Sequence, residues 1–445
     1  MVPGLAAREL DLSIRHTFAK RCLRERLPNM RKRLDINVCD GRLPEPVGHD
    51  VALAHPARIT EVCVAEGVIF VLAENGLCAG YCVYDGRRLC VLNTDAQMVV
   101  RSMFHNKATC PPGLITVSVH AADHYAFLRC RQTSLAQLRE GTTAHFTLLF
   151  TTEELKWPGF VEFDDVNSKV LTFSSGSNMY KVWAMAAPQQ LLYSFGVQAL
   201  PQGIGEVKIS PSVMLLVSNR PPNAASLLLR ILSIETGEVL RDVHQPIRPT
   251  RKVDILEQFS QRLLLKQEAS PLRIVDLLTD KVIKVADTEV GVPSAFIYLH
   301  ANETFLLFRD NAVSVWNFRG ERLHGFEDHA LCFPIPDIDH ASAIYITQNQ
   351  DMIISLCEDV PAPAPVGDAG GGSGSGGQLE LPEPVSDPSV SIHISNIHTG
   401  KLVARVDRRA WEGSNLPVVT ALYYAEETGD LITGDAHGRL EVWSS

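Results

Sequence analysis

Long apolar runs are absent from this sequence. No stretch approaches the roughly 18–20 consecutive apolar residues that a bilayer-spanning helix needs, and the mean hydropathy is only +0.03. We therefore expect neither a membrane protein nor a membrane partner. Apolar residues still make up 45% of the 445 positions, which is ample for a large core built from many short elements.

We also expect no secretory leader, because basic residues interrupt every apolar stretch near the start of the sequence. Residues 1–33 carry a balance of +6 although the whole chain carries −10. The remainder is therefore strongly acidic, which argues against general nucleic-acid binding by it. Ten cysteines without a leader favour a cytoplasmic or nuclear location. Import into an organelle by the basic segment is the alternative.

The basic segment has a helical pattern. Four apolar residues recur in it at intervals of four, namely Leu10, Ile14, Phe18 and Cys22. This pattern predicts a short amphipathic helix within residues 8–27 that ends near Pro28. We interpret residues 1–33 as an N-terminal extension, either a targeting or docking segment or a tail without a role. Residues 34–57 are interpreted as a linker that contains one strand, Leu34–Val38.

Recognisable catalytic motifs are lacking too. The sequence has no Gly-x-Ser-x-Gly elbow, His-Glu-x-x-His pair or Walker-type loop, and the glycine-rich run 370–377 has no lysine to bind phosphate. Glu162, Asp164 and Asp165 could bind a cation or form an acid–base pair, but a solvated turn at a strand end is the simpler interpretation. We therefore expect a protein that is not an enzyme and that has no cofactor.

Zinc-ligand spacing is likewise missing. Cys78 and Cys82 are four residues apart, but no second close pair follows them, and a structural zinc site needs four ligands. Buried strand cysteines are the better interpretation, because free cysteine is among the most buried residue types. His120 and His124 form a close pair without a third ligand, so we predict no metal there.

What the sequence does contain is a repeated strand pattern, clearest in its last fifteen residues, LITGDAHGRLEVWSS. Two short strands, Leu431–Thr433 and Arg439–Trp443, are joined by a polar turn through Gly434, Asp435 and Gly438. Alternation of period two together with a glycine-containing turn predicts a half-buried hairpin.

Most copies of this unit end in an aromatic or apolar residue followed by a polar one. The end positions are Tyr84, a weaker one near Cys130, Trp183, Leu232, Val275, Trp316, Ser395 and Trp443. They are 41–53 residues apart except for one step of 79, and the four-stranded blades of β-propellers recur at about 40–50 residues. The long step contains residues 361–388, a Pro/Gly/Ser-rich tract that we expect to be a disordered insertion.

The repeats predict an all-β fold, a single closed β-propeller of four-stranded blades over residues 58–445. We count eight blades, with seven as the alternative because Val99–Phe150 is the weakest repeat. The last unit, Val418–Trp443, supplies only three strands. Leu34–Val38 is a candidate for the missing outer strand, since pairing it there would close the ring.

Over roughly residues 55–445 the repeats resemble the WD40-like, transducin-type propeller superfamily. Through Leu155–Phe173 and Ala312–His329 the chain also resembles a green-plant and algal family of WD40-like proteins. The resemblance implies a WD-repeat propeller and supports fold more than function.

The stretch Val315–Arg319 resembles the Trp-Asp-x-Arg box with which some WD40 propellers dock onto the adaptor of cullin-RING ubiquitin ligases. The resemblance implies that Trp316, Asn317 and Arg319 form the box, with Arg319 as the contact and Asn317 in place of Asp. The alternative is that Arg319 is an ordinary hairpin residue beside Gly320.

Two further tryptophans, Trp157 and Trp411, fall in predicted connections between blades. Tryptophan and arginine dominate binding hot spots, so both residues are candidates for partner contacts. The leading hypothesis is a non-catalytic scaffold for other proteins. One alternative is a substrate receptor of a cullin-RING ligase, and the other is a metal-binding or enzymatic propeller, motivated only by the three acidic residues.

Overall fold

The computed structural model describes most of the chain between residues 25 and 445. The described ranges are 25–38, 55–106, 112–125, 127–151, 160–164, 167–184, 190–221, 223–286, 290–291, 293–327, 330–331, 344–358, 390–407 and 419–445. None of the helices in these ranges is long and apolar enough to cross a bilayer. The predicted helix of residues 8–27 falls outside them except for its last residues, and the predicted insertion 361–388 falls wholly outside.

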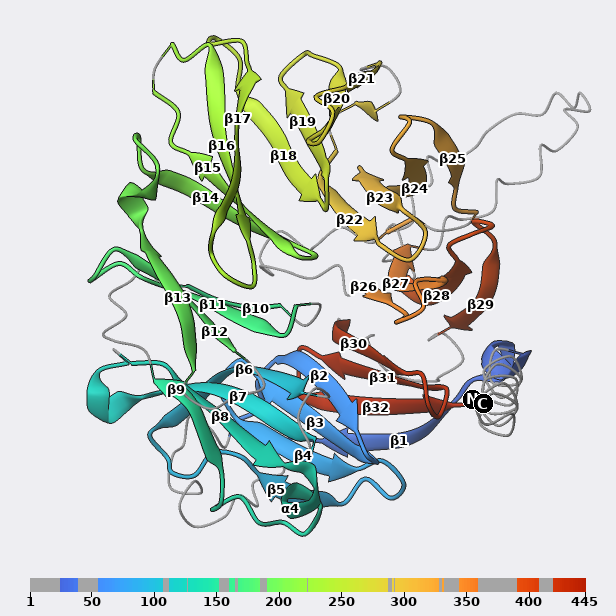
Figure 1. Cartoon of the computed structure of the whole chain (residues 1–445). Coiled ribbons are helices and arrows are strands. Elements are labelled where there is room, and N and C mark those ends of the chain that lie inside the picture. The colour runs from blue at the N-terminus through green and yellow to red at the C-terminus, as the bar shows by residue number, and fades with distance from the viewer. Residues whose placement is uncertain are drawn as a thin grey trace, which may run out of the picture.

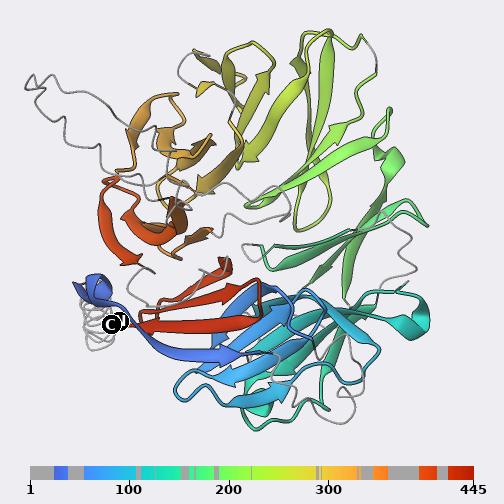
Figure 2. The ribbon, with the colours of Figure 1, turned by 180° about the vertical axis from the view of Figure 1, so that it is seen from behind.

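Eight antiparallel four-stranded sheets stand as blades around a ring (Figure 1). The view from behind shows the same closed arrangement (Figure 2). The predicted all-β, eight-bladed propeller is therefore confirmed, and the seven-bladed alternative is excluded. Blade 2, which has the weakest repeat, is complete.

In each blade the strands follow one another from the centre of the ring outward. Blade 1 is β2 (Ile59–Ala65), β3 (Val68–Ala73), β4 (Cys78–Cys82) and β5 (Arg88–Val91); blade 2 is β6 (Met98–Asn106), β7 (Gly113–His120), β8 (Arg129–Ser134) and β9 (Thr147–Thr151). Blade 3 is β10 (Phe160–Asp164), β11 (Lys169–Ser174), β12 (Met179–Ala184) and β13 (Leu191–Gly196); blade 4 is β14 (Ile204–Ser210), β15 (Val213–Ser218), β16 (Ser226–Ser233) and β17 (Val239–Pro246).

The second half of the ring continues in the same order. Blade 5 is β18 (Val253–Phe259), β19 (Arg262–Gln267), β20 (Leu272–Asp276) and β21 (Val282–Val285); blade 6 is β22 (Ala295–Leu299), β23 (Thr304–Arg309), β24 (Ala312–Asn317) and β25 (Arg322–Gly325). Blade 7 is β26 (Ile344–Ile346), β27 (Met352–Glu358), β28 (Val390–Asn396) and β29 (Leu402–Asp407); blade 8 is β30 (Val419–Ala425), β31 (Asp430–Asp435), β32 (Arg439–Ser444) and β1 (Arg31–Asn37).

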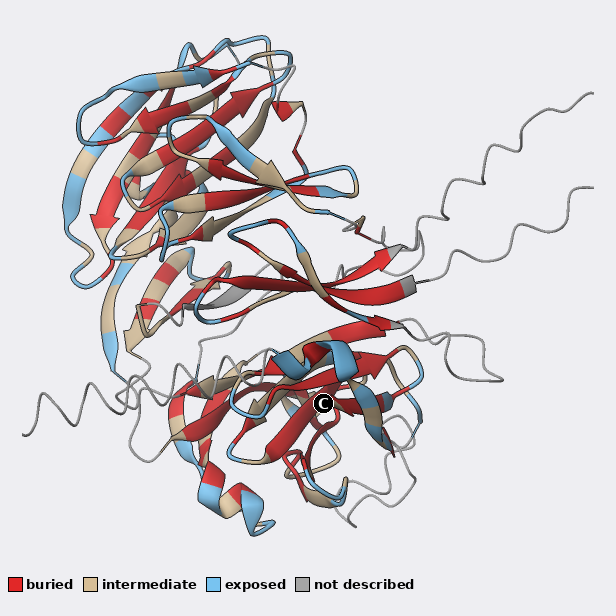
Figure 3. Cartoon of the chain, turned by 90° about the vertical axis from the view of Figure 1, so that its right-hand side faces the viewer, coloured by how far each residue is buried: buried red, intermediate tan, exposed pale blue. Residues whose placement is uncertain are grey.

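The core lies between the blades, along their middle strands. β3 is buried at every position, whereas the outermost strand β17 is exposed at five of its eight positions. Figure 3 shows buried segments running through the blades and exposed segments at turns and outer edges. A short continuous apolar run is what a strand covered on both faces requires, so the run VIFVLA of β3 fits a sheet that packs against neighbours on both sides.

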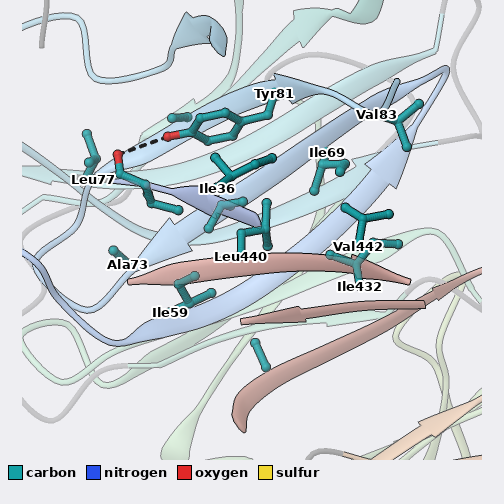
Figure 4. Packing of buried hydrophobic residues seen from close by; sticks show 14 of the residues in the cluster. Ile36, Ile59, Ile69, Ala73, Leu77, Tyr81, Val83, Ile432, Leu440 and Val442 are labelled. Carbon is teal, nitrogen blue, oxygen red and sulfur yellow. Dashed lines mark hydrogen bonds between the residues drawn. The ribbon is translucent and has the colours of Figure 1, made fainter. Parts of the chain in front are cut away.

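The N-terminal strand β1 closes the ring by pairing antiparallel with β32, with Leu34 opposite Val442. This is the arrangement predicted for Leu34–Val38, although the strand begins at Arg31. Side chains of β1 and β32 pack with those of blade 1, and the Tyr81 hydroxyl donates a hydrogen bond to the Val38 carbonyl at 3.0 Å (Figure 4). Closure removes the free sheet edge that β32 would otherwise present.

Short helical segments accompany the strands in the described ranges, among them η1 (Leu27–Asn29), η2 (Ala121–Asp123), α4 (Leu135–Arg139) and η3 (Val197–Ala199). In η1, Leu27 is 1% exposed and packs with residues of blades 7 and 8. In α4, Leu135 and Leu138 pack into the core that blade 1 shares with blade 2. This helix stands where other blades have a tight turn between the third and fourth strands, which explains the weak repeat in blade 2.

Candidate functional site

In several blades the polar residue that ends the repeat caps the turn between the third and fourth strands. In blade 6, Asn317 Oδ1 accepts hydrogen bonds from the amides of Arg319 and Glu321, both at 3.0 Å, and Asn317 Nδ2 donates to the Glu321 carboxylate at 2.7 Å. Side chains at equivalent turns accept amide hydrogen bonds in the same way, those of Asp85, Asp276 and Asn396. Asn317 therefore forms the turn that an aspartate would form.

Trp316, the residue before this cap, is a structural residue of blade 6. It is 2% exposed, and its indole Nε1 donates to the Ser314 hydroxyl at 2.8 Å. Trp183 and Trp443 make corresponding indole bonds to threonine hydroxyls on the adjacent strand. Of the three box residues, only Asn317 and Arg319 reach the surface, so Trp316 can affect a partner only by supporting the turn.

The turn itself is fixed against blade 5. Phe318 packs on Phe259, Tyr298 and Phe305, with ring centroids 5.3–6.1 Å apart. Gly320 has φ +80°, and a Cβ added there would lie 2.6 Å from a Val285 methyl of β21. A backbone this close, in the left-handed region, requires glycine. The contacts leave Arg319 exposed, and its guanidinium has no partner within the described part of the chain.

Exposed apolar side chains lie on the outer strands of blades 5 and 6 and on the turn before β21. Leu278, in the turn before β21, is 64% exposed; Val282, on β21, is 45% exposed; and Leu323, on β25, is 49% exposed. Four exposed cationic residues lie on the same strands and turns. We call these seven residues the basic–apolar rim: Leu278, Val282, Leu323, Lys281, Lys284, Arg319 and Arg322.

The rim is electrostatically distinct from the rest of the chain. None of its four cations forms an ion pair with a residue that the structure describes, whereas nearby carboxylates are engaged elsewhere. Asp280 pairs with Arg241 at 2.7 Å, and Asp276 pairs with Arg262. The exposed Glu321 carboxylate, on the same turn as Arg319, bonds to the uncharged Asn317 amide. The four cations outnumber it, so in a protein of net charge −10 the rim has a local excess of positive charge beside apolar side chains.

Asp276 illustrates how the carboxylates are held. Burial acts to raise its pKa, but hydrogen bonds from the Thr279 and Leu278 amides and the charge of Arg262 outweigh burial, so the pKa lies below its usual range. The carboxylate therefore stays ionised and keeps the turn that presents Leu278.

The apolar exposure continues onto blade 4. Val239 and Leu240, at the start of β17, are both exposed. Arg241 of the same strand donates to the carbonyls of Leu277 and Leu278 and pairs with Asp280. These bonds tie β17 to the turn that carries Leu278, so the exposed residues of three successive blades lie along one edge of the ring.

The other predicted site residues lie where the structure describes no side chains. Trp157 and Trp411 lie outside the described residues, as does Asp165. Glu162 and Asp164 lie on β10, where only the backbone is described. For these five residues the predictions stay predictions.

The histidines and cysteines form no metal centre in the described ranges, where no group of three His, Cys, Asp or Glu side chains is placed to hold an ion. His120 lies 3.7 Å from Asp95, and burial together with Arg129 lowers its pKa; His124 is exposed after η2. The prediction of buried strand cysteines holds for Cys78, whereas Cys82 at the end of β4 is only partly buried. Cys90 is buried on β5, and burial raises its pKa to about 11.

Sequence reasoning missed the apolar members of the rim. A signal was available, because Val282 and Leu323 are apolar residues on segments whose position after a turn predicts outer edge strands. Their exposure depends on how blade 5 meets blade 6, and the repeat pattern does not contain that information.

The comparisons with known proteins identify a family and similar solved structures. The chain belongs to the family described as Domain of unknown function (DUF7899), whose profile matches residues 15–443. Among solved structures, the computationally designed Ika8 protein is similar with a TM-score of 0.52 and 14% identity, over 88% of this chain and 97% of that chain. BamB from Moraxella catarrhalis aligns with a TM-score of 0.42 and 12% identity, over 94% of this chain and 98% of that chain. No curated protein matches the chain.

Proposed function

From this family membership and fold, neither of which assigns an activity, we propose that the protein is a non-catalytic scaffold that holds partner proteins on the basic–apolar rim. The observation that carries the proposal is the coincidence of exposed Leu278, Val282 and Leu323 with four cations that lack partners among the described residues. The proposal requires that these side chains act as one patch, because exposed apolar patches rimmed by polar residues mark protein-interaction sites. A propeller offers a rigid frame for such a surface, although fold alone is only an analogy.

The chemistry of the rim defines the partner it suits. Burying a leucine or valine side chain contributes roughly 1.5–3 kcal/mol each, and unpaired cations favour carboxylates in a complementary partner. Arg319 and Arg322 are suited to an interface because a guanidinium makes several directed hydrogen bonds to a carboxylate. We therefore expect a partner surface that presents acidic residues around apolar ones.

The test is affinity purification with mass spectrometry on the native chain and the double variant Leu278→Ser/Leu323→Ser. Tyr84→Ser is the matched control, because Tyr84 is 75% exposed near the equivalent turn of blade 1. We expect the double variant to lose partners that the native chain and the Tyr84→Ser control retain. Recovery of the same partners with all three proteins would exclude the rim as the binding surface.

A substrate receptor of a cullin-RING ligase is the more specific candidate within the scaffold class. Its support is that Arg319 is exposed without a partner in the described ranges and that Asn317 caps the turn as an aspartate would. An adaptor that is captured by the native chain and lost with Arg319→Ala would favour this candidate. Partners that are identical for both proteins and include no adaptor would reject it while leaving the broader scaffold role intact.

A further inference from the structure

A cavity of about 540 Å³ lies on the inner side of blades 4 to 6, far from the outer strands of the rim. It is lined where β14 and β18 begin, by the end of β15 and by the start of β22. Small-molecule sites usually have volumes of roughly 300–1,000 Å³. The cavity is therefore large enough for a metabolite of modest size.

The innermost strands of blades 1, 2, 4, 5 and 8 share a β-bulge close to their starts. In blades 1 and 8 the bulged residues are threonines whose hydroxyls serve the fold: Thr60 donates to the Leu72 carbonyl at 3.1 Å, and Thr420 donates to the Ile59 carbonyl at 2.6 Å. In blades 4 and 5 the bulged residues are Gly205 and Asp254, and both line the cavity. Bulges often re-aim a side chain at a functional site.

Asp254 differs from the threonines because its carboxylate has no hydrogen bond or ion pair to any residue that the structure describes. Gly205 differs because it has no side chain: a Cβ there would lie 2.8 Å from Asn219 Oδ1, so the glycine makes room for the Asn219 amide. The exposed Asn219 amide also lines the cavity, and within the described ranges its side chain has no bonding partner. A carboxylate and an amide are thus available to a ligand.

The cationic residues of the cavity fall into two groups. Lys208 is held between Glu206 and Glu257, at 2.9 Å from each carboxylate, and Arg220 donates to backbone carbonyls of residues 248–251. Lys252 is exposed, and no described residue pairs with it. Lys252 and Asp254 are two positions apart in the sequence, and both line the cavity. Their charges are opposite, but they form no ion pair with each other.

We propose that this cavity binds a free α-amino acid with an apolar side chain. The ligand ammonium would pair with Asp254, and its carboxylate would accept hydrogen bonds from Lys252 and the Asn219 amide. Val217, Leu227 and Phe296 supply apolar lining for the side chain. The pairing of both charges with opposite groups is what selects a zwitterion over a simple anion or cation. The inference is independent of the scaffold role, which concerns the outer edge of the ring.

The test is calorimetric titration of the full chain with L-leucine, N-acetyl-L-leucine and L-leucinamide. The native chain should bind L-leucine, and each derivative, which lacks one of the two charges, should bind more weakly by about tenfold or more, because hydrogen bonds to charged groups are the strong ones. Asp254→Asn should weaken L-leucine binding similarly while leaving the already weak N-acetyl-L-leucine unchanged. Glu238→Gln, an exposed carboxylate on the outer turn of blade 4, is the matched control and should bind as the native chain does.

Thermal unfolding of each variant verifies that it folds, and Asp254→Asn should fold normally because the native carboxylate bonds to no described residue. The proposal is overturned if the folded native chain binds neither L-leucine nor L-phenylalanine at millimolar concentration. It is also overturned if Asp254→Asn binds L-leucine as tightly as the native chain. Neither result would bear on partner capture by the basic–apolar rim.

Discussion

The outermost strand of blade 8 and the outermost strands of blades 5 and 6 occupy the same place in their blades but use their charges differently. In β1, Lys32 lies 3.0 Å from Asp35 and 3.2 Å from Glu441, and Arg33 bonds to Ser444 and to the Tyr84 carbonyl. In β21 and β25 the cations of the basic–apolar rim have no ion-pair partner among described residues. The charged residues of β1 therefore bind β32 and blade 1, which closes the ring, whereas the cations of the rim form no ion pair with a described residue.

The apolar residues differ in the same direction. Ile36 of β1 packs into the core between blades 8 and 1, while Leu278 and Leu323 extend into solvent. Charged residues on an edge strand discourage unwanted pairing, but that role does not require exposed leucines beside them. The difference indicates that β1 is committed to the fold and that the rim is available to a partner.

The largest effect on stability is expected for Trp316→Ala, which removes a buried side chain beneath the turn that carries Arg319 and does not change β1. Because Trp316 is buried, we expect a loss of about 3–5 kcal/mol in the free energy of unfolding, measured by chemical denaturation. Arg319→Ala is the control and should stay within about 0.5 kcal/mol of the native value. Equal stabilities for the two variants would contradict the structural role of Trp316.

Gly320→Ala tests the contact between the blade 6 turn and β21. We expect a loss of roughly 1–2 kcal/mol, because an alanine in the left-handed region is strained and its Cβ would collide with Val285. Arg322→Ala, exposed at the start of β25 just after this turn, should change the unfolding free energy little. A Gly320→Ala protein as stable as Arg322→Ala would show that the turn does not rest on β21 as described.

Lys32→Ala removes a charge of β1 that lies close to two carboxylates, those of Asp35 and Glu441. Loss of its ion pairs should reduce the unfolding free energy by about 1 kcal/mol, and added salt should shrink that difference. Lys284→Ala, on the rim, should have no measurable effect at either salt concentration. Similar effects from the two substitutions would contradict the view that the charges of β1 stabilise the fold and those of the rim do not.

The smallest expected effect concerns pH and Asp276. Its pKa is lowered in the folded protein, so the stability gained from its charge is fully present above the unfolded value of about 3.9 and is lost as pH falls through the folded value. Asp276→Asn keeps the turn geometry, as Asn317 does, but loses the pair with Arg262. The native chain should exceed the variant by about 0.5 kcal/mol at neutral pH, and urea titrations should show the gap closing below about pH 4. A gap that widens toward acid would contradict the assigned cause.

The propeller could be predicted because each blade repeats the same local chemistry. Trp316 and Trp443 mark third strands, and the residues that follow several third strands cap turns, so the repeat is visible without any long-range information. Blade 2 is harder to recognise because α4 replaces the turn, and its Leu135 and Leu138 are buried by contact with blade 1. That burial depends on residues from another repeat.

The candidate site was only partly predictable for the same reason. Arg319 could be singled out from its motif, and its side chain lies at the surface. The exposure of Leu278 depends on bonds from Arg241, 37 positions earlier in the chain. The bulge at Asp254 depends on the register of β18 against β19, which alternation of apolar residues along one strand does not fix.

The pairing of β1 with β32 also bears on how the protein is made. Arg33 and Ser444, which meet in blade 8, are 411 positions apart, so β1 leaves the ribosome first among the described strands and finds its partner last. Until then it is an unpaired strand beside an incomplete ring. A chain whose synthesis stops before Arg439 has no β32, so β1 has no partner and the ring stays open. The ring can therefore close only after β32 has been synthesised.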